Sequence, residues 1–487
     1  VSRDDGGHWQ EVTPKALPEW SYIGAVEIST HKSNTVYLSA TCYKLDDYDP
    51  YLYRSRDGGK SWQSINGNFP AGEITRVIRS DAVRPGLLFV GTETGIFYSL
   101  DDGKHWNRMR GGLPVAPVYD LKIKDADLIA ATHGRSFWIL DDITPLREMP
   151  IGSGRKAAPL LFTPRSTYRF KLQWAAGVFD GDGKDYSPAF GLAGATYRQK
   201  QPDGVTVRRH LDVGENPPGG AIFYYWLEGK PESAVELSVC DKTGVVIESF
   251  SSAETEKPER RLPTNPGLNR FVWNLSYPAA KPLDPALVTR DYEPLAKEPK
   301  GKGPAAPPGQ YGVRLSIDGK GATASFSLLK DPRVDTTQVD LDEQFELLQQ
   351  LTAKRSELRA HVDRIRQMKR QLDDLVEKLP KGVRTGVSST TSIRKKLEII
   401  ENVLVDARRE SPRDVLRHPA GLDDTLGGLM WSVTMADTAP PIQTREVSVE
   451  VVRKIDAEIR KLNKLVDGPI ATLNEKVTKA GVPAVIA

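Results

Sequence analysis

Several features that would point to a particular class of protein are scarce in this chain. Its 487 residues include only two cysteines, Cys42 and Cys240, which belong to no metal-ligand pattern and are expected in different domains. A structural disulfide is therefore not expected, and both side chains are interpreted as small buried hydrophobic groups. The low cysteine count fits either the cytoplasm or the periplasm.

Long apolar runs and a strong charge of one sign are also missing. No stretch approaches the roughly 20 apolar residues that a membrane-spanning helix needs. The formal net charge is +3, with 39% hydrophobic and 27% charged residues, which is a globular composition close to neutrality. No phosphate-binding loop, zinc pattern or Ser/His/Asp set is evident. The sequence therefore predicts no nucleic acid partner and no membrane span.

What the N-terminal quarter does contain is three copies of one phrase, Ser-x-Asp-x-Gly-x-x-Trp. The intervals between the copies are close to the roughly 40–45 residues of a β-propeller blade. The phrase is typical of a strand, a tight turn and a second strand. Its Asp accepts hydrogen bonds from the turn, its Gly allows positive φ, and its Trp packs between blades. The residues with these structural roles are Ser2, Asp4, Gly6, Trp9, Ser55, Asp57, Gly59, Trp62, Ser99, Asp101, Gly103 and Trp106.

Short apolar or alternating runs around these copies predict the strands of about four terminal blade units. The expected strands cover residues 22–26, 35–40, 74–78, 87–91, 95–98, 118–123, 127–132 and 136–141. Residues 160–162 are a candidate final strand of the same region. The chain begins at Val1, in the middle of a blade, so we expect that N-terminal sequence is missing.

The repeated phrase, together with residues 88–97 and 131–146, resembles a large family of bacterial Asp-box (BNR-repeat) β-propeller proteins. These proteins are known as sortilin-like or glycosyl-hydrolase-like. The likeness continues through residues 216–220 and 267–274 into the C-terminal tail, so the chain resembles the C-terminal half of such a protein. The resemblance implies an architecture rather than a chemistry, because no activity is established for most members. It also implies a secreted or periplasmic location.

Three expected domains follow from changes in periodicity, and they give a multidomain chain that is mainly β and then α. Residues 1–165 are expected to form terminal blades of an incomplete propeller, and residues 166–335 an immunoglobulin- or fibronectin-like β-sandwich with an irregular leading segment. Residues 336–487 are expected to form a helical bundle. The sandwich strands are expected at 221–227, 234–240, 245–250, 269–275, 311–317 and 322–328. The helices are expected at 341–379, 392–409, 422–435 and 444–479.

Two further patterns receive structural interpretations. Tyr224, Trp226 and Trp273 could stack against a sugar, but they lie inside strand patterns and are expected in the core. The first helix is rich in basic residues with acidic ones between them, which is typical of a solvated mixed face. The helices could equally form a partner-binding or dimerisation module. The basic residues are Arg355, Arg359, Arg364, Arg366, Lys369 and Arg370.

One group of candidate chemical residues is the acidic loop that lengthens a propeller blade. Its carboxylates could supply a general acid or hold a calcium ion through oxygen ligands. Aspartates in exposed loops are common, so an ordinary loop is the alternative. The residues are Asp46, Asp47 and Asp49.

Two other groups are weaker candidates. One has carboxylates at alternating positions like a calcium loop, but lacks the downstream Glu of the helix–loop–helix site, so a polar turn is the alternative. It consists of Asp180, Asp182 and Asp185. The other group lies in the last two blades and could bind a ligand. Its arginine could bind an anionic ligand, or it could equally tie neighbouring blades together. It consists of Glu93, His133 and Arg135.

These features favour an extracytoplasmic binding or scaffold protein whose propeller recognises a ligand or a protein partner. The alternative is a glycoside hydrolase acting on poly- or oligosaccharide, with two carboxylates about 5–9.5 Å apart that lie largely outside this chain. Calcium is the one candidate cofactor. Because a propeller must close to protect its edge strands, we expect a missing N-terminal propeller portion or a companion chain as partner, besides a protein or carbohydrate ligand.

Overall fold

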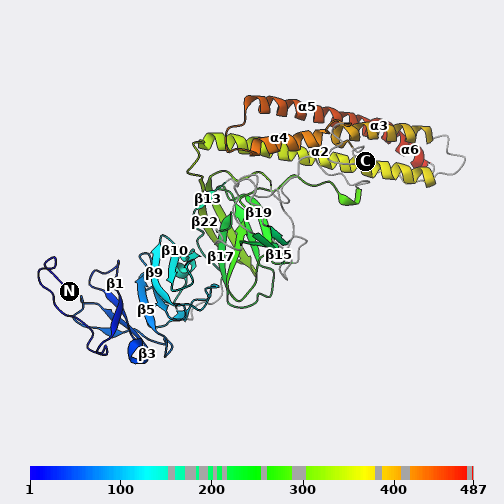
Figure 1. Cartoon of the computed structure of the whole chain (residues 1–487). Coiled ribbons are helices and arrows are strands. Elements are labelled where there is room, and N and C mark those ends of the chain that lie inside the picture. Colours follow the sequence, from blue (N-terminus) through cyan, green and yellow to red (C-terminus); the bar gives the residue numbers. More distant parts are fainter. Residues whose placement is uncertain are drawn as a thin grey trace.

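The computed structural model describes residues 1–151, 159–170, 183–185, 196–200, 206–210, 217–253, 260–287, 303–378, 387–406, 417–479 and 485. Three regions follow one another along the chain (Figure 1). Antiparallel sheets come first, a second group of sheets lies in the middle, and long helices form the C-terminal end. The chain is thus mainly β followed by a helical region.

The N-terminal region consists of three antiparallel sheets in which strands adjacent in sequence are adjacent in space. The first sheet contains β1 (Tyr22–Ile28), β2 (Val36–Cys42), β3 (Asp47–Ser55) and β4 (Gln63–Ser64). The second contains β5 (Thr75–Ser80), β6 (Leu88–Thr92), β7 (Ile96–Ser99) and β8 (Asn107–Arg108). The third contains β9 (Val118–Lys124), β10 (Asp127–Thr132) and β11 (Phe137–Asp141). The expected strands are confirmed, and this up-and-down order is typical of propeller blades.

Apolar side chains join each of these sheets to the next. Leu52 of β3 and Ile78 of β5 share one buried cluster, which packs the first sheet on the second. Phe89 of β6 and Leu121 of β9 share another, which packs the second sheet on the third. The first strands of the three sheets, β1, β5 and β9, lie next to one another.

Two expectations for this region were wrong. Residues 1–151 form three such sheets rather than about four, because the first repeat copy lies in a segment, residues 1–21, that contains no strand. Leu160 and Leu161 form β12 (Leu160–Leu161), which pairs with β17 (Ala221–Leu227) of the middle region instead of returning to the N-terminal sheets.

The middle region is built from two sheets that face each other. One has the order β12–β17–β20 and the other β13–β22–β21–β18–β19. Rings interlock between them: Phe223 and Phe326 meet edge to face at 5.4 Å, and Trp273 lies 5.7 Å from Tyr311. The remaining bounds are β13 (Thr167–Arg169), β18 (Glu236–Cys240), β19 (Val246–Ser251), β20 (Gly267–Trp273), β21 (Gly309–Ile317) and β22 (Lys320–Lys330). A separate small sheet contains β14 (Gly183–Asp185), β15 (Thr196–Lys200) and β16 (Thr206–His210).

The alternation along β17 decides where the aromatic residues of this region lie. Phe223 and Tyr225 are fully buried between the two sheets, and Trp273 of β20 is buried with them, as the sequence predicts. Tyr224 and Trp226 occupy the intervening positions and are only partly buried. Because successive side chains of a strand point to opposite faces, these two residues lie outside this core.

The C-terminal helices share one apolar core. They are α2 (Gln338–Lys378), α3 (Val387–Val405), α4 (Leu422–Thr434), α5 (Ile442–Leu465) and α6 (Ala471–Lys479), with a π-helical turn at Val466–Ile470. Short helical segments elsewhere are η1 (Tyr43–Leu45), α1 (Thr144–Glu148) and η5 (Pro285–Leu287). The expected fourth helix is divided at the π-turn, which contains Pro469, a residue without the N–H that a regular helix requires. Within the described part of the chain, no helix is long and apolar enough to cross a membrane.

The solvated interpretation of the first helix is wrong for three of its arginines, Arg355, Arg359 and Arg366, which are buried. Both Arg355 and Arg359 donate to the two carboxylate oxygens of Asp423 on α4, at 2.9–3.1 Å. Arg366 donates to Glu401 on α3 at 2.8 Å. These ion pairs lie between helices, so they fix how α2 packs on α3 and α4.

Two adjacent glycines of α4 should respond oppositely to alanine. A Cβ at Gly427 would lie 2.9 Å from Nη2 of Arg355, whereas nothing lies within 4 Å of one at Gly428. We expect Gly428→Ala to stabilise the helical region by about 0.5–1 kcal/mol, the difference in helix propensity, and Gly427→Ala to destabilise it. Urea unfolding followed by far-UV circular dichroism measures both. Equal stabilisation by both substitutions would show that Arg355 does not occupy this position.

Candidate ligand-binding face

The loops of the three N-terminal sheets fall on two opposite faces, because successive strands run in opposite directions. The second and third repeat copies connect β3 to β4 and β7 to β8 on one face. The opposite face carries the β2–β3, β6–β7 and β10–β11 connections and the beginnings of β5 and β9. Of the first and third candidate groups, Asp46, Glu93, His133 and Arg135 lie in these connections, and Asp47 and Asp49 lie at the start of β3 on the same face.

Four side chains on this second face form a continuous stack that crosses all three sheets. The guanidinium of Arg76, at the start of β5, lies 4.5 Å from the ring centroid of Tyr43 and 4.9 Å from that of Tyr119. The Tyr119 ring in turn stacks on the His133 ring at 5.1 Å and 14°. Cation–π contacts of this kind are worth about 0.5–2 kcal/mol each, depending on how far they are desolvated. We call these residues the Arg76 stack.

Glu93 fixes the arginine of the Arg76 stack in place. Both Nε and Nη2 of Arg76 donate to Oε2 of Glu93, at 3.0 and 2.6 Å. Burial works to lower the pKa of Arg76, but the hydrogen bonds to Glu93 and Tyr43 outweigh it and the pKa is raised. Arg76 therefore stays charged and is held between two rings.

The structure brings two of the three candidate ligand-binding residues, Glu93 and His133, into or beside the Arg76 stack. Arg135 lies exposed on the same β10–β11 connection, and its carbonyl accepts a hydrogen bond from the Trp138 indole at 2.8 Å. It makes no stacking contact with the other two among the described residues. Sequence reasoning missed Arg76 and Tyr119, because their partners come from different sheets and no local motif marks them.

The acidic loop lies on the same face, but its carboxylates bind within the loop. Asp47 accepts hydrogen bonds from the Tyr51 hydroxyl at 2.6 Å and from the Asp49 backbone N–H at 3.0 Å. Asp46 accepts a long one from Tyr48 at 3.4 Å. The described residues include no group of three acidic, His or Cys side chains arranged to hold a metal ion. Asp180, Asp182 and the side chain of Asp185 lie outside the described residues.

The three repeat copies make the same set of hydrogen bonds. In each, the Ser hydroxyl accepts from the Gly N–H at 2.7–2.9 Å, and the Asp accepts from the N–H four residues on at 2.8–2.9 Å. In the second copy, bonds from the Ser61 hydroxyl and N–H lower the pKa of Asp57 to about 2. The aspartates of the repeats are thus used by their own turns, and those of the second and third copies lie on the face away from the Arg76 stack.

Two other carboxyl groups with raised pKa values lie at the opposite end of β11 from the Arg76 stack. Burial, and then the charge of Asp127, raise the pKa of Asp141, and burial raises that of Asp142. Asp127 also accepts a hydrogen bond from Arg165 at 2.6 Å. This cluster joins the third sheet to the segment that leads into the middle region.

No family model matches this chain, and a search of curated proteins finds no match. Similar solved structures include YCF48 bound to a D1 peptide, with 14% identity over 45% of this chain and 56% of that chain, at a TM-score of 0.20. A GH74 enzyme of Niastella koreensis shares 11% identity over 62% of this chain and 38% of its own, at 0.21. PorZ, a surface component of the type-IX secretion system of Porphyromonas gingivalis, shares 10% over 63% and 39%, at 0.20.

This chain therefore spans 56% or less of each of these three proteins. The fold of the N-terminal region is defined by the order and packing of its own sheets.

Proposed function

We propose that this chain belongs to a propeller-based binding or scaffold protein that acts outside the cytoplasm. We interpret the three N-terminal sheets as propeller blades, the two facing sheets as an immunoglobulin- or fibronectin-like sandwich and the helices as a bundle. The observation that carries the proposal is the Arg76 stack, because it joins three sheets on the face opposite the second and third repeat turns. The resemblance to secreted and periplasmic Asp-box proteins supports the location.

The Arg76 stack has the properties of a preformed recognition surface. Tyr119 is 47% exposed and His133 is also exposed, so both aromatic side chains are accessible to a partner. Rings of this kind offer contact area at little cost in side-chain entropy. The Arg76–Glu93 pair holds them before binding, which reduces the ordering that association requires.

A glycoside hydrolase is the alternative, but the carboxylates on this face favour binding. A glycosidase needs two carboxylates facing each other across a sugar. Here Glu93 is paired with Arg76 and Asp47 is bonded to Tyr51. Buried Glu73 accepts a hydrogen bond from Thr94 at 2.6 Å. Each of these carboxylates already forms an ion pair or a hydrogen bond with a neighbouring side chain, so we assign them structural roles.

Exposed apolar residues at both ends of the row of sheets support a partner that completes the propeller. Val26 of β1 is 58% exposed, and Tyr22 and Ile28 of the same strand are also exposed. Phe137 and Ile139 of β11 are exposed at the other end of the row. Where one of the three sheets packs on the next, apolar side chains are buried instead. We propose that further blades, from the same polypeptide or from a companion chain, cover these residues.

Peptide selection tests whether the Arg76 stack binds a partner. Random peptides displayed on phage are selected on this chain and their affinities measured against Tyr119→Ala/His133→Ala. Because these rings are the open part of the stack, we expect the double variant to bind about tenfold or more weakly. Lys124→Ala, on an exposed residue at the far end of β9, is the matched control and should not change the affinity.

Either of two results would overturn the proposal. One is selected peptides that bind the wild-type chain and the double variant equally well. The other is release of new reducing ends from xyloglucan or sialyllactose by the wild-type chain, abolished by Asp47→Asn or Glu93→Gln, which would establish a glycosidase.

A further inference from the structure

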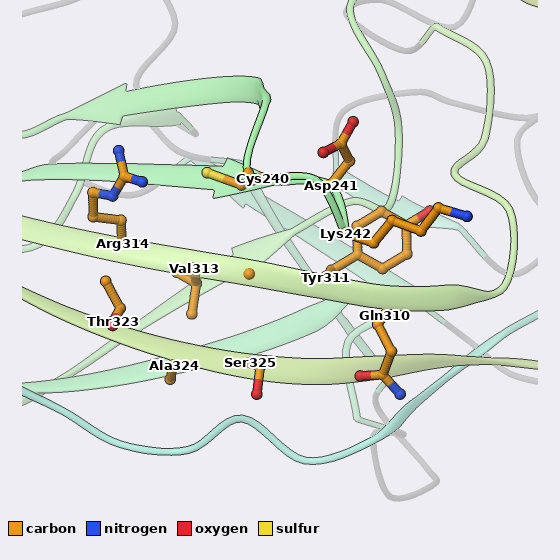
Figure 2. A pocket seen from close by; sticks show the side chains of 12 residues that line it. Cys240, Asp241, Lys242, Gln310, Tyr311, Val313, Arg314, Thr323, Ala324 and Ser325 are labelled. Carbon is orange, nitrogen blue, oxygen red and sulfur yellow. The ribbon is translucent and has the colours of Figure 1, made fainter.

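A shallow pocket of about 300 Å³ lies on the five-stranded sheet of the middle region, against β18, β21 and β22. Tyr311 and Val313 of β21 point into the core between the sheets. Gln310, Gly312 and Arg314 alternate with them and therefore lie on the outer face. Figure 2 shows Arg314 at one end of the pocket and Lys242 at the other. This site is separate from the Arg76 stack and independent of the function proposed above.

Gly312 in this pocket is not explained by the fold. It lies inside a strand and does not adopt positive φ. A Cβ there would meet only Cβ of Cys240 at 3.8 Å and the carbonyl oxygen of Ala324 at 4.0 Å, which are ordinary contacts. Glycine weakens a strand interior, and one reason for its presence there is the close approach of a ligand. Any side chain at this position would project into the pocket.

The charge of the pocket is positive. Arg314 and Lys242 are both exposed, and neither forms an ion pair with the described residues. The acidic lining residue, Asp241, is used by its own turn, where it accepts from the N–H and hydroxyl of Thr243 at 2.8 and 2.6 Å. These bonds, that of the hydroxyl first, lower the pKa of Asp241. Its carboxylate therefore offsets part of the charge of Arg314 and Lys242, and the charge of the lining remains positive.

The adjacent strand β22 contributes two hydroxyl groups to the pocket. Ser325 is opposite Gly312 in the sheet register, and Thr323 is opposite Arg314. Among the described residues that line the pocket, no aromatic ring offers a stacking surface, because the ring of Tyr311 packs on Trp273 and Phe326 in the core. A neutral sugar bound by stacking therefore does not suit this pocket, whereas a small polyhydroxylated anion does.

We propose that this pocket binds one or two residues of an acidic saccharide. The sugar carboxylate or sulfate lies on the guanidinium of Arg314, which matches the geometry of such groups, and Lys242 attracts a second anionic group. Ser325 and Thr323 contact the sugar hydroxyls, and the ring passes close over Gly312. The pocket volume is at the lower end of the range for small-ligand sites, which suits so short a ligand.

Isothermal titration with defined oligosaccharides tests this site. We expect tetragalacturonate or a heparin-derived tetrasaccharide to bind and maltotetraose not to bind. Both oligosaccharides carry carboxylates, so binding of tetragalacturonate would show that carboxylates suffice, and binding of the heparin tetrasaccharide alone would show that sulfates are required. Binding should weaken between about 50 and 500 mM NaCl, because salt screens exposed charges. Arg314→Gln should weaken it about tenfold or more, and Gly312→Val should abolish it. Lys320→Gln, an exposed lysine at the other end of the hairpin, is the matched control.

Four results would overturn the proposal: no binding of either acidic oligosaccharide, equal binding of maltotetraose, an unchanged affinity in a folded Gly312→Val variant, or equally tight binding of a single-stranded oligonucleotide. Arg314→Gln changes an exposed side chain, so it keeps the test valid if Gly312→Val does not fold. The Tyr119→Ala/His133→Ala variant should bind the saccharide normally, which separates this site from the Arg76 stack.

Discussion

Asp423→Asn should destabilise the helical region by about 3–5 kcal/mol, the usual loss when one partner of a buried ion pair is removed. The Asp423 carboxylate is fully buried and receives two hydrogen bonds from each of Arg355 and Arg359. An amide cannot neutralise two guanidinium groups, so buried positive charge would remain between α2 and α4. Urea unfolding of the full chain, followed by circular dichroism at 222 nm, measures the loss, because the helices lie in this region.

The matched control is Asp373→Asn on the same helix as the two arginines. Asp373 pairs with Arg394 at 2.8 Å, but both side chains are about half exposed, at 56% and 44%. Exposed pairs contribute about 0–1 kcal/mol. A loss at Asp423 no larger than that at Asp373 would mean that water reaches the buried pair, and would contradict the packing described here.

The same ion pair has a predictable dependence on pH. Burial alone would raise the pKa of Asp423, but the hydrogen bond and charge of Arg355, and then the charge of Arg359, outweigh it, so the pKa is lowered in the folded state. A lowered folded pKa contributes stability above the unfolded value of about 3.9, and this contribution is lost as the pH falls through the folded pKa. Asp423→Asn should therefore remove part of the acid sensitivity of the helical region.

Much of the fold could be predicted from local patterns in the sequence. The apolar run at residues 221–227 predicts a strand and the helical spacing of Leu358, Val362 and Ile365 predicts a helix face, so both elements could be predicted without knowledge of neighbours. Which face of the strand enters the core could not be predicted, because every residue of the run is apolar or aromatic, and the expectation that Tyr224 and Trp226 lie in the core was wrong. The burial of Arg355 could not, because its partner Asp423 lies on another helix and a mixed charge pattern is usually solvated. A local sequence pattern does not show which helices or strands contact each other.

Some residues of the candidate binding face could also be identified from the sequence, whereas others could not. The acidic loop and the Glu93 and His133 positions could be singled out, because they lie in connections between predicted strands. Arg76 and Tyr119 could not, because each is an ordinary residue at the start of a strand, and their significance comes only from the packing of β5 beside β9. The position of the guanidinium between two rings depends on residues from all three sheets.

The three repeat tryptophans should respond very differently to alanine, although their local sequences are nearly the same. Trp106 is 4% exposed, packs edge to face on Phe69 at 5.5 Å and donates its indole N–H to the Ile65 carbonyl at 2.8 Å. Trp106→Ala should therefore cost about 3–5 kcal/mol. Hydrogen exchange of the β6–β8 amides measures this loss, because it reports the opening of this sheet separately from the helices.

Trp9→Ala is the matched control for Trp106→Ala. Trp9 is 77% exposed, so its removal should change stability by no more than about 0.5 kcal/mol. Trp62 is partly buried and donates to the Val12 carbonyl at 2.6 Å, so Trp62→Ala should give an intermediate loss. The turn of the repeat forms in all three copies, and only packing between sheets distinguishes them. A loss at Trp9 equal to that at Trp106 would mean that the first copy is packed in solution, and that the segment before β1 belongs to a sheet that this structure does not form.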